Sequence, residues 1–600
     1  MCGITGIIGY TSHSKALTQI KEMNDIISHR GPDSEGFFSD KNVFFGHRRL
    51  SIIDISNLGL QPMSYEEELT ITYNGEIYNY NDIKVELLAD GYIFKNNTDT
   101  EVILAAYRKW GVKCFNKFNG MWAFALYDKR KNIVLLSRDR FGVKPLYYTT
   151  IQGIFYFASE IKQLLRVSDT VKINESNFLD VMVSGFENFN NETMFKDIFS
   201  LEQGCYSIIN LENLIVTEER YYSLHDEVKK NNFKEIKYFN ILESAVKLRM
   251  RADVQVGTCL SGGLDSSCIS ALASKVFHSD TNERFLAIHA RATEKNIDES
   301  NYAKLVAEHL GLELQYVTPS FEDFVENIDE LVYVQEEMFG TSQFMGYDVF
   351  RKAKQKNCKV MLNGQGADET LLGYERYYVD FFNTLTFKEK TENFFKFFLN
   401  SGLSLKTWII YLIYFNFTKI RKKYLLQRSF LRDEFINKVK FEALNILSGA
   451  KTIKEKQILE VSRIQLPHLL RYEDRNSMRH SIETRLPFLD FRCVEKAINL
   501  TIEEKIYNGW TKIVLRNSFA DLLPNKILWR KNKLGFEAPE KTWLYQYKKE
   551  MINSIKTSKL VEKYFDVNQL CNNFEAMNTK DQWRFFIISR WEKVFKICIE

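Results

Sequence analysis

The sequence predicts two domains in one chain, an N-terminal α+β domain of antiparallel sheets and a C-terminal α/β domain built on a parallel sheet. Its 600 residues are too many for a single hydrophobic core. Over the first two hundred residues, short apolar or alternating segments are separated by turn residues, which is the pattern of antiparallel strands. Beyond residue 240, apolar segments alternate with helical patterns, as in parallel strands joined by crossover helices.

The N-terminal part is expected to pack two antiparallel sheets with helices outside them. Strands are predicted at 4–10, 42–47, 69–75, 120–128, 132–139, 145–150 and 153–159. Apolar residues recur with helical spacing at 15–27, 82–88 and 101–109, where we expect helices.

A polar, charged stretch at 211–238 predicts a linker, so that the domains comprise residues 2–210 and 239–600. In the second domain, strands are predicted at 254–260, 285–290, 312–317 and 359–364, with helices beginning at Asp265 and Glu299. The segment 377–465 is helical and rich in aromatic residues, and no motif in it indicates its role.

Composition excludes several classes of protein. With 45% hydrophobic residues, 26% charged residues and a net charge of +4, the chain gives no reason to expect nucleic acid as a partner. Its nine cysteines form no CxxC pair, which argues against a zinc site or a disulfide scaffold and favours reduced thiols in the cytoplasm. No secretory signal is recognisable, and the sequence leaves open whether the protein is a homodimer.

The longest apolar run, Trp408–Phe417, is far shorter than the roughly 20 residues that cross a bilayer. We therefore expect a buried helix there and no stable membrane insertion. The basic cluster KIRKK follows directly and leaves a peripheral membrane contact open.

Cysteine at position 2 is chemically special, because removal of Met1 would place a thiol and a free α-amine on one residue. An α-amine titrates near about 7.7–8.0, so it can accept the proton of its own thiol. The alternative is that Cys2 is an ordinary strand residue.

Cys2 is part of the first of seven notable segments: CGITGI (2–7), HRGPDSEG (29–36), GHRRLSIID (46–54), QPM (61–63), YNGEIYNY (73–80), TDTEVIL (98–104) and SRDRFGVKPLYY (137–148). In this order and register, they resemble class II glutamine amidotransferase domains. The resemblance implies an αββα sandwich of the N-terminal-nucleophile type, with Cys2 as the nucleophile.

The same resemblance implies a glutamine site. Arg49 suits the α-carboxylate as a bidentate partner, and the acids Glu76 and Asp99 suit the α-ammonium. The Asn74 amide and the Gly75 N–H would form an oxyanion hole, although Asn-Gly is also a strong hairpin-turn signal. Leu50, Ser51, Ile52 and Ile53 complete the expected glutamine-binding set.

The segment VQVGTCLSGGLDSS (254–267) reads as an apolar strand, a glycine turn and a helix start. Gly262 and Gly263 let the backbone approach an anion at the helix N-terminus. A carboxylate at Asp265 would repel pyrophosphate, which suggests a bridging Mg²⁺. The alternative is that Ser261 is a helix cap and Asp265 responds to the helix dipole.

This segment resembles the PP-loop of ATP pyrophosphatases, and joined to a class II glutaminase it resembles the asparagine synthetase family. Further matches lie at 359–374, 469–490, 511–516 and 523–539. The resemblance implies a PP-loop α/β domain with helical additions, Mg²⁺ held by Asp265 and Asp368, and Lys512 as the residue that neutralises developing charge. The implied ATP-binding residues are Leu260, Ser261, Gly262, Gly263, Asp265, Ser266, Ile288, Asn363 and Gly364.

Asp474, Arg475, Glu483 and Arg485 form either a surface ion-pair network or, as the resemblance favours, one wall of the acceptor site. Three departures from the family pattern concern the acceptor. Asn363 replaces Ser, Gln365 stands where familiar members carry Glu, and Thr370–Leu372 replaces LFG or VFG.

The predicted enzyme is an ATP-dependent carbon–nitrogen ligase with glutamine as nitrogen donor. The predicted reaction converts ATP, L-aspartate, L-glutamine and water to L-asparagine, L-glutamate, AMP and pyrophosphate, through a Cys2 thioester and an acyl-adenylate. The alternatives are amidation of another carboxylate, such as a sugar uronate in surface polysaccharide synthesis, and a degenerate binding or regulatory protein.

Overall fold

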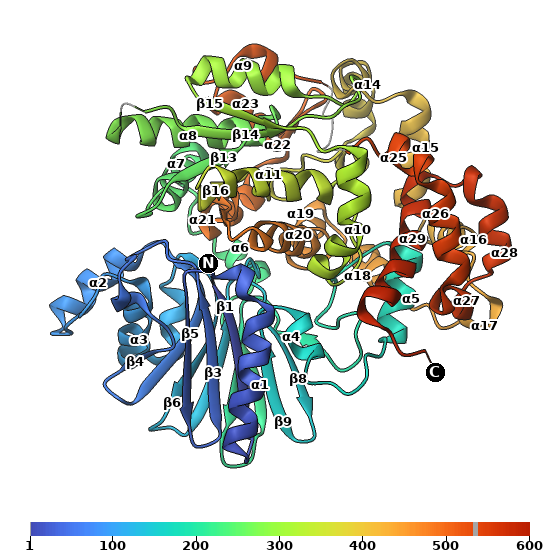
Figure 1. Cartoon of the computed structure of the whole chain (residues 1–600). Helices are drawn as coiled ribbons and strands as arrows, with labels where there is room; N and C mark the ends of the chain where they lie inside the picture. The colour runs from blue at the N-terminus through green and yellow to red at the C-terminus, as the bar shows by residue number, and fades with distance from the viewer. Residues whose placement is uncertain (1, 282, 532–537, 600) are drawn as a thin grey trace.

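The computed structural model describes residues 2–281, 283–531 and 538–599, and two differently built halves stack on one another in it (Figure 1). The N-terminal half, coloured blue to cyan, holds two six-stranded sheets. The C-terminal half, green to red, holds a five-stranded sheet surrounded by helices.

The first N-terminal sheet has the strand order β10-β8-β9-β1-β3-β2, with antiparallel pairing throughout. Its strands are β1 (Gly3–Ile8), β2 (Ser34–Asp40), β3 (Val43–Arg49), β8 (Tyr147–Ile151), β9 (Ile154–Ala158) and β10 (Phe199–Ser200). The second sheet has the order β12-β11-β7-β6-β5-β4. Its strands are β4 (Met63–Tyr65), β5 (Leu69–Ile77), β6 (Gly120–Asp128), β7 (Ile133–Arg138), β11 (Cys205–Asn210) and β12 (Val216–Arg220).

The two sheets face each other across a core that contains Ile4, Phe45, Ala125, Leu136 and Phe157. Outside the first sheet lies α1 (His13–Ile26), and α2 (Tyr80–Ala89) and α3 (Asp99–Trp110) cover the second. The expected αββα arrangement is therefore confirmed. The expected strands and helices of this half are present with ends shifted by at most two residues.

The C-terminal sheet is wholly parallel, as predicted, with the order β15-β14-β13-β16-β17. Its strands are β13 (Val256–Cys259), β14 (Leu286–Ala290), β15 (Glu313–Val317), β16 (Val360–Leu362) and β17 (Glu483–Arg485). The helices that connect and cover these strands are α7 (Tyr238–Arg249), α8 (Leu264–Asp280), α9 (Ser300–Leu310), α10 (Phe321–Gln335), α11 (Gln343–Gln355), α20 (Leu466–Arg479) and α21 (Phe491–Asn499). The edge strand β17 was not predicted, because three residues are too few to show a pattern.

The stretch 211–238, interpreted from its polarity as a linker, contains β12 and α6 (Leu224–Lys230). All five residues of β12 are exposed, and the strand pairs with β11 at the edge of the second sheet. A solvated edge strand carries charged side chains, so composition alone could not distinguish it from a linker.

The aromatic segment after β16 is helical, as expected, and includes α13 (Tyr377–Thr384), α14 (Phe387–Ser401), α15 (Leu405–Asn416) and α16 (Thr418–Gln427). The expectation that the apolar run of α15 is buried holds for one face only. Trp408 is 3% exposed, whereas Ile409, Ile410 and Ile413 are 43–52% exposed. Among the described residues, no helix is long and apolar enough to cross a membrane.

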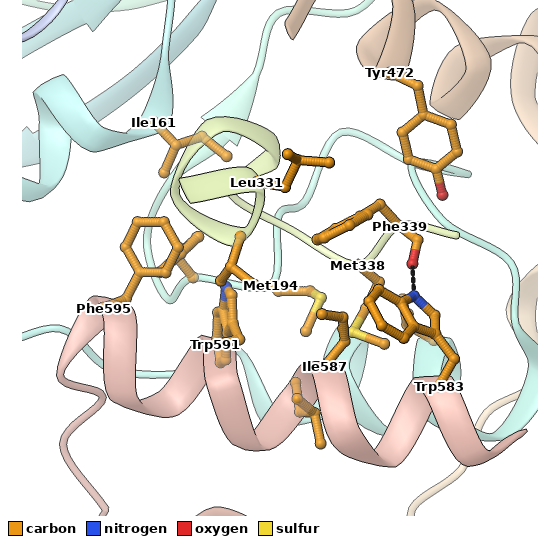
Figure 2. Close-up of a cluster of buried hydrophobic side chains, with 14 of the residues drawn as sticks. Ile161, Met194, Leu331, Met338, Phe339, Tyr472, Trp583, Ile587, Trp591 and Phe595 are labelled. Carbon is orange, nitrogen blue, oxygen red and sulfur yellow. Dashed lines mark hydrogen bonds between the residues drawn. The ribbon is translucent and has the colours of Figure 1, made fainter. Parts of the chain in front are cut away.

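One hydrophobic core joins the two halves (Figure 2). The long C-terminal helix α29 (Thr579–Phe595) packs beside α10 and places Trp591 1% exposed in this core. Ile161 of α4 (Ile161–Leu165) and Phe195, both from the N-terminal half, lie in the same cluster, and the Phe195 and Trp591 ring centroids are 4.9 Å apart. The Trp591 indole N–H also donates to the Glu336 carbonyl at 2.7 Å.

We expect Trp591→Ala to destabilise the whole chain, because a fully buried Trp replaced by Ala costs about 3–5 kcal/mol. The thermal midpoint measures the effect, since a chain of this size does not unfold in two states. Tyr545→Ala, whose side chain is 80% exposed, is the control and should change stability by no more than about 0.5 kcal/mol. Equal thermal midpoints for the two variants would contradict the conclusion that the core shared by the two halves stabilises the chain.

Candidate functional site

Cys2 lies directly before β1 and is only 7% exposed. Its backbone N–H donates to Asn74 Oδ1 at 3.0 Å, and its carbonyl accepts from Arg30 Nε at 3.0 Å. The main chain of Cys2 is thus held from both sides. Burial raises the pKa of the Cys2 thiol, so the sulfur carries its proton at neutral pH and needs a base to become a nucleophile.

Asn74 is fully buried on β5, and its Nδ2 atom has no hydrogen-bond partner among the described residues. Because an unpaired buried N–H costs about 1–3 kcal/mol, this amide is suited to receive an oxygen atom from a ligand beside Cys2. At Gly75, a Cβ atom would lie 2.1 Å from the Met121 carbonyl oxygen. Glycine therefore permits the close pairing of β5 with β6 at this point.

The carboxylate-binding candidate Arg49 is 6% exposed, and the loop 50–59 curls around its guanidinium. Arg49 Nη1 donates to the Ser56 carbonyl at 2.8 Å and Nη2 to the Asp54 carbonyl at 2.5 Å. The Ser51 N–H donates to Asp33 Oδ2 at 2.7 Å, which holds the start of this loop. Of the remaining expected residues, Leu50 and Ile52 are buried and Ile53 is half-buried.

Of the two acids expected to bind ammonium, Glu76 lies near the end of β5 and Asp99 is the first residue of α3. Asp99 Oδ2 accepts from the Tyr73 hydroxyl and from the Ile77 N–H, both at 2.8 Å. Burial raises the pKa of Asp99 to about 6 and raises that of Glu76 well above its ordinary value. With a pKa of about 6, Asp99 is mainly ionised at neutral pH.

In the C-terminal half, the PP-loop follows β13 and leads into α8. Gly262 adopts a φ of +79°, and a Cβ atom there would lie 2.6 Å from the Ala303 nitrogen. Gly263 caps α8 without a side-chain hydrogen bond, which leaves backbone N–H groups of the first turn without a side-chain acceptor. Ser261 is therefore not the cap of α8; its hydroxyl accepts from the Gly263 N–H at 3.2 Å.

Leu260 and Gly364 follow the carboxyl ends of β13 and β16, near which ligands of open α/β sheets bind, and Ile288 lies within the adjacent strand β14. The Leu260 N–H donates to the Ile288 carbonyl at 2.9 Å. Gly364, just after β16, packs against the start of α8, since a Cβ atom there would lie 2.9 Å from the Ser266 nitrogen.

Lys512 is 3% exposed and joins the two predicted metal ligands. Its Nζ lies 2.6 Å from Asp265 Oδ2 and 2.6 Å from Asp368 Oδ1. Asp265 Oδ1 is buried with no hydrogen-bond partner in the described part of the chain. Two carboxylates that share one cation, with an oxygen to spare, fit a Mg²⁺ site.

The four charges interpreted as a surface network or an acceptor wall are buried at the interface between the two halves. Arg30 Nη1 lies 2.8 Å from Asp474 Oδ2 and 2.9 Å from Glu160 Oε1, and Arg30 is fully buried. Although burial alone raises it, the Arg30 guanidinium holds the pKa of Asp474 below its ordinary value. Arg475 Nη2 donates to Glu336 at 2.6 Å, so this charge too is neutralised locally.

Glu483 and Arg485 continue this buried network toward the N-terminal half. Arg485 Nε donates to Glu483 Oε1 at 2.5 Å, and Arg485 Nη2 lies 3.6 Å from Glu76 Oε1. Arg30 and Glu160 were missed as interface residues. Arg30 stands inside the matched segment 29–36, but nothing in the local sequence indicates its partner on α20.

Comparison with known proteins agrees with this two-part architecture. The sequence model of the glutamine amidotransferase domain matches residues 1–222, and that of asparagine synthase matches residues 238–593. The chain belongs to the glutamine-hydrolysing asparagine synthetase family. It is accordingly an ATP-dependent, glutamine-hydrolysing ligase of that family.

Relatives span nearly the whole chain of this asparagine synthetase family member. Asparagine synthetase (glutamine-hydrolysing) 1 of Bacillus subtilis is 31% identical over 99% of this chain and 97% of its own. Asparagine synthetase (glutamine-hydrolysing) 3 of the same organism is 30% identical over 88% and 86%. Amidase chry2 of Gibberella zeae is 27% identical over 90% of both chains.

Of the segment 523–539, which resembles the family in sequence, residues 532–537 lie outside the described residues.

We expect Arg30→Met to destabilise the joint between the two halves, because it leaves the buried carboxylates of Glu160 and Asp474 without their partner. Removing one member of a buried ion pair costs about 3–5 kcal/mol. Arg48→Met, which breaks pairs with the exposed acids Asp25 and Glu35, should cost no more than about 1 kcal/mol. Thermal midpoints of the two variants compare the costs, and a smaller loss for Arg30→Met than for Arg48→Met would refute the interface assignment.

Proposed function

We propose that this protein makes L-asparagine from L-aspartate, with ATP as energy source and glutamine as nitrogen donor. The observation that carries the proposal is the pairing of Cys2 with Asn74, whose free amide N–H lies beside the thiol residue, in a chain that also holds the Lys512 carboxylate cluster. The Cys2–Asn74 pair supports amide hydrolysis, and the cluster of Lys512 with two carboxylates supports chemistry on a nucleotide.

In the proposed glutaminase step, the α-amine of Cys2 takes the thiol proton once Met1, which lies outside the described residues, has been removed. The sulfur then attacks the side-chain carbonyl of glutamine, and the oxyanion binds to Asn74 Nδ2 and the Gly75 N–H. Collapse of this intermediate forms a thioester and releases ammonia, and water then releases glutamate.

Glutamine is proposed to bind at its α-carbon end through opposite charges. Arg49 takes the α-carboxylate, lined by Leu50, Ser51, Ile52 and Ile53. Asp99, ionised above a pKa of about 6, takes the α-ammonium, and Glu76 donates or accepts a hydrogen bond beside it.

In the proposed synthetase step, the acceptor carboxylate attacks the α-phosphorus of ATP, forming an acyl-adenylate and releasing pyrophosphate. Leu260, Ile288, Asn363 and Gly364 would line the adenosine pocket, and Ser261, Gly262, Gly263 and Ser266 would hold the phosphates. Asp265 and Asp368 would hold Mg²⁺, which offsets the charge of pyrophosphate when bound. Lys512 supplies a further positive charge at the same place.

In the loop 363–372, the residues that differ from the family pattern are not equally placed to affect the choice of acceptor. Leu371 and Leu372 are fully buried, and the Thr370 hydroxyl donates to the Gly366 carbonyl at 2.7 Å, so these three residues serve packing. Asn363 and Gln365 remain part-exposed. The acceptor question therefore rests on these two residues, and another carboxylate is the alternative outcome.

Cys2→Ala should abolish glutamine-dependent amide synthesis while leaving synthesis from ammonium within about twofold of wild type, because only the first site loses its nucleophile. Glutamate release and amide formation are measured in parallel with each nitrogen source. Cys114→Ala, a buried cysteine of the same half, is the control and should retain glutaminase activity. Unchanged glutamine hydrolysis by Cys2→Ala would show that another residue is the nucleophile.

Purified protein with ATP, Mg²⁺ and ammonium should release AMP and pyrophosphate only when aspartate is present, with asparagine formed in equal amount. The products separate two mechanisms, because ADP and phosphate would indicate an acyl-phosphate instead of an adenylate. Glutamine hydrolysis without asparagine formation would instead favour another carboxylate, such as a uronate, as acceptor.

A further inference from the structure

Amide formation from an acyl-adenylate produces a proton that some group must accept. Ammonia attacks as a neutral molecule, and its nitrogen must lose one hydrogen to become the amide. Gln365, in the loop that follows β16, cannot accept that proton, because an amide has no basic site at neutral pH. The nearby acids of this loop have other partners: Asp368 pairs with Lys512, and Glu369 accepts from the Tyr374 hydroxyl at 2.5 Å.

Glu473 on α20 lies at the right place for this role. Its Oε1 accepts from Asn363 Nδ2 at 2.8 Å. Asn363 directly follows β16 and precedes Gly364, the residue that packs against the first turn of α8. One hydrogen bond therefore separates the Glu473 carboxylate from the loop proposed to hold the adenylate.

The next residue of α20, Asp474, points to the other site. It pairs with Arg30, which in turn holds the Cys2 carbonyl. Two consecutive acids thus contact the two candidate sites, and Glu473 lies on the side of the PP-loop. The residue as a whole is half-buried, and its carboxylate faces Asn363.

The acidity of Glu473 suits proton transfer. Burial raises the pKa of its carboxyl to about 7, with the hydrogen bond from Asn363 and the charge of Lys144 acting in the opposite direction. A base with a pKa close to the working pH combines a large ionised fraction with useful basicity.

We propose that Glu473 is the general base of the amide-forming step, with Asn363 as the residue that positions its carboxylate. The inference rests on the proposed adenylate chemistry. The nitrogen lone pair of ammonia forms the C–N bond, the acyl C–O bond breaks, and its electron pair leaves with AMP. The proton released from nitrogen passes to the Glu473 carboxylate, so that charge and atoms balance.

The test is Glu473→Gln in the full chain, which keeps the shape and an oxygen for the Asn363 amide but removes the basic oxygen. Aspartate-dependent ATP–pyrophosphate exchange, which reports adenylation, and glutamine hydrolysis should stay within about twofold of wild type. Asparagine formation from ammonium should fall by about 10²–10⁴-fold, the usual contribution of a general base. Glu473→Asp keeps a carboxylate, so its rate of asparagine formation should lie between those of the wild type and Glu473→Gln.

Glu495→Gln is the matched control, because burial raises the pKa of Glu495 to about 7 as well, while its partner is the Tyr222 hydroxyl at 3.0 Å. The Glu495→Gln variant should form asparagine at a rate within about twofold of wild type. Unimpaired asparagine formation by Glu473→Gln would overturn the inference. So would an equal loss of pyrophosphate exchange, or equal impairment of Glu473→Asp and Glu473→Gln, either of which would indicate a packing or adenylation role. A wild-type protein without aspartate-dependent exchange would instead overturn the proposed acceptor, and with it the role of Glu473 in asparagine formation.

Discussion

The buried guanidinium of Arg30 is the contact on which the arrangement of both sites depends. It binds the Cys2 carbonyl, Glu160 of its own half and Asp474 of the other half, and no part of it is exposed. An Arg in such a place must be fully paired, because an uncompensated buried charge is very costly. The position of the nucleophile candidate and the position of α20 are therefore set together.

Apolar packing reinforces this polar joint. The core around Trp591 takes side chains from α29 and α10 and from the N-terminal Ile161 and Phe195, so the halves do not fold around separate centres only. Buried ion pairs and apolar contacts therefore act together to fix the two halves relative to one another.

The PP-loop half follows a different constraint, the geometry of parallel strands. Their carboxyl ends meet at one edge, and this brings Leu260, Ile288 and Gly364 together although they belong to three strands. Lys512 lies outside the sheet and forms ion pairs with two carboxylates, those of Asp265 and Asp368. Asn363, which follows β16, donates to Glu473, so that α20 contacts the loop proposed to hold the nucleotide through one residue and the N-terminal half through the next.

By itself, the sequence predicted the fold class, many of the strands, the first helices and the helical character of 377–465, because hydrophobic period and glycine placement act over a few residues. It also singled out Cys2 and the segment 254–267 as candidate sites. It did not determine that β12 is an edge strand, that one face of α15 is exposed, or that Asp474, Arg475, Glu483 and Arg485 lie buried between the halves. Only the tertiary structure decided these points. Arg30 and Asp474 are 444 positions apart, and whether a charge is solvated or paired depends on the distant surface that covers it.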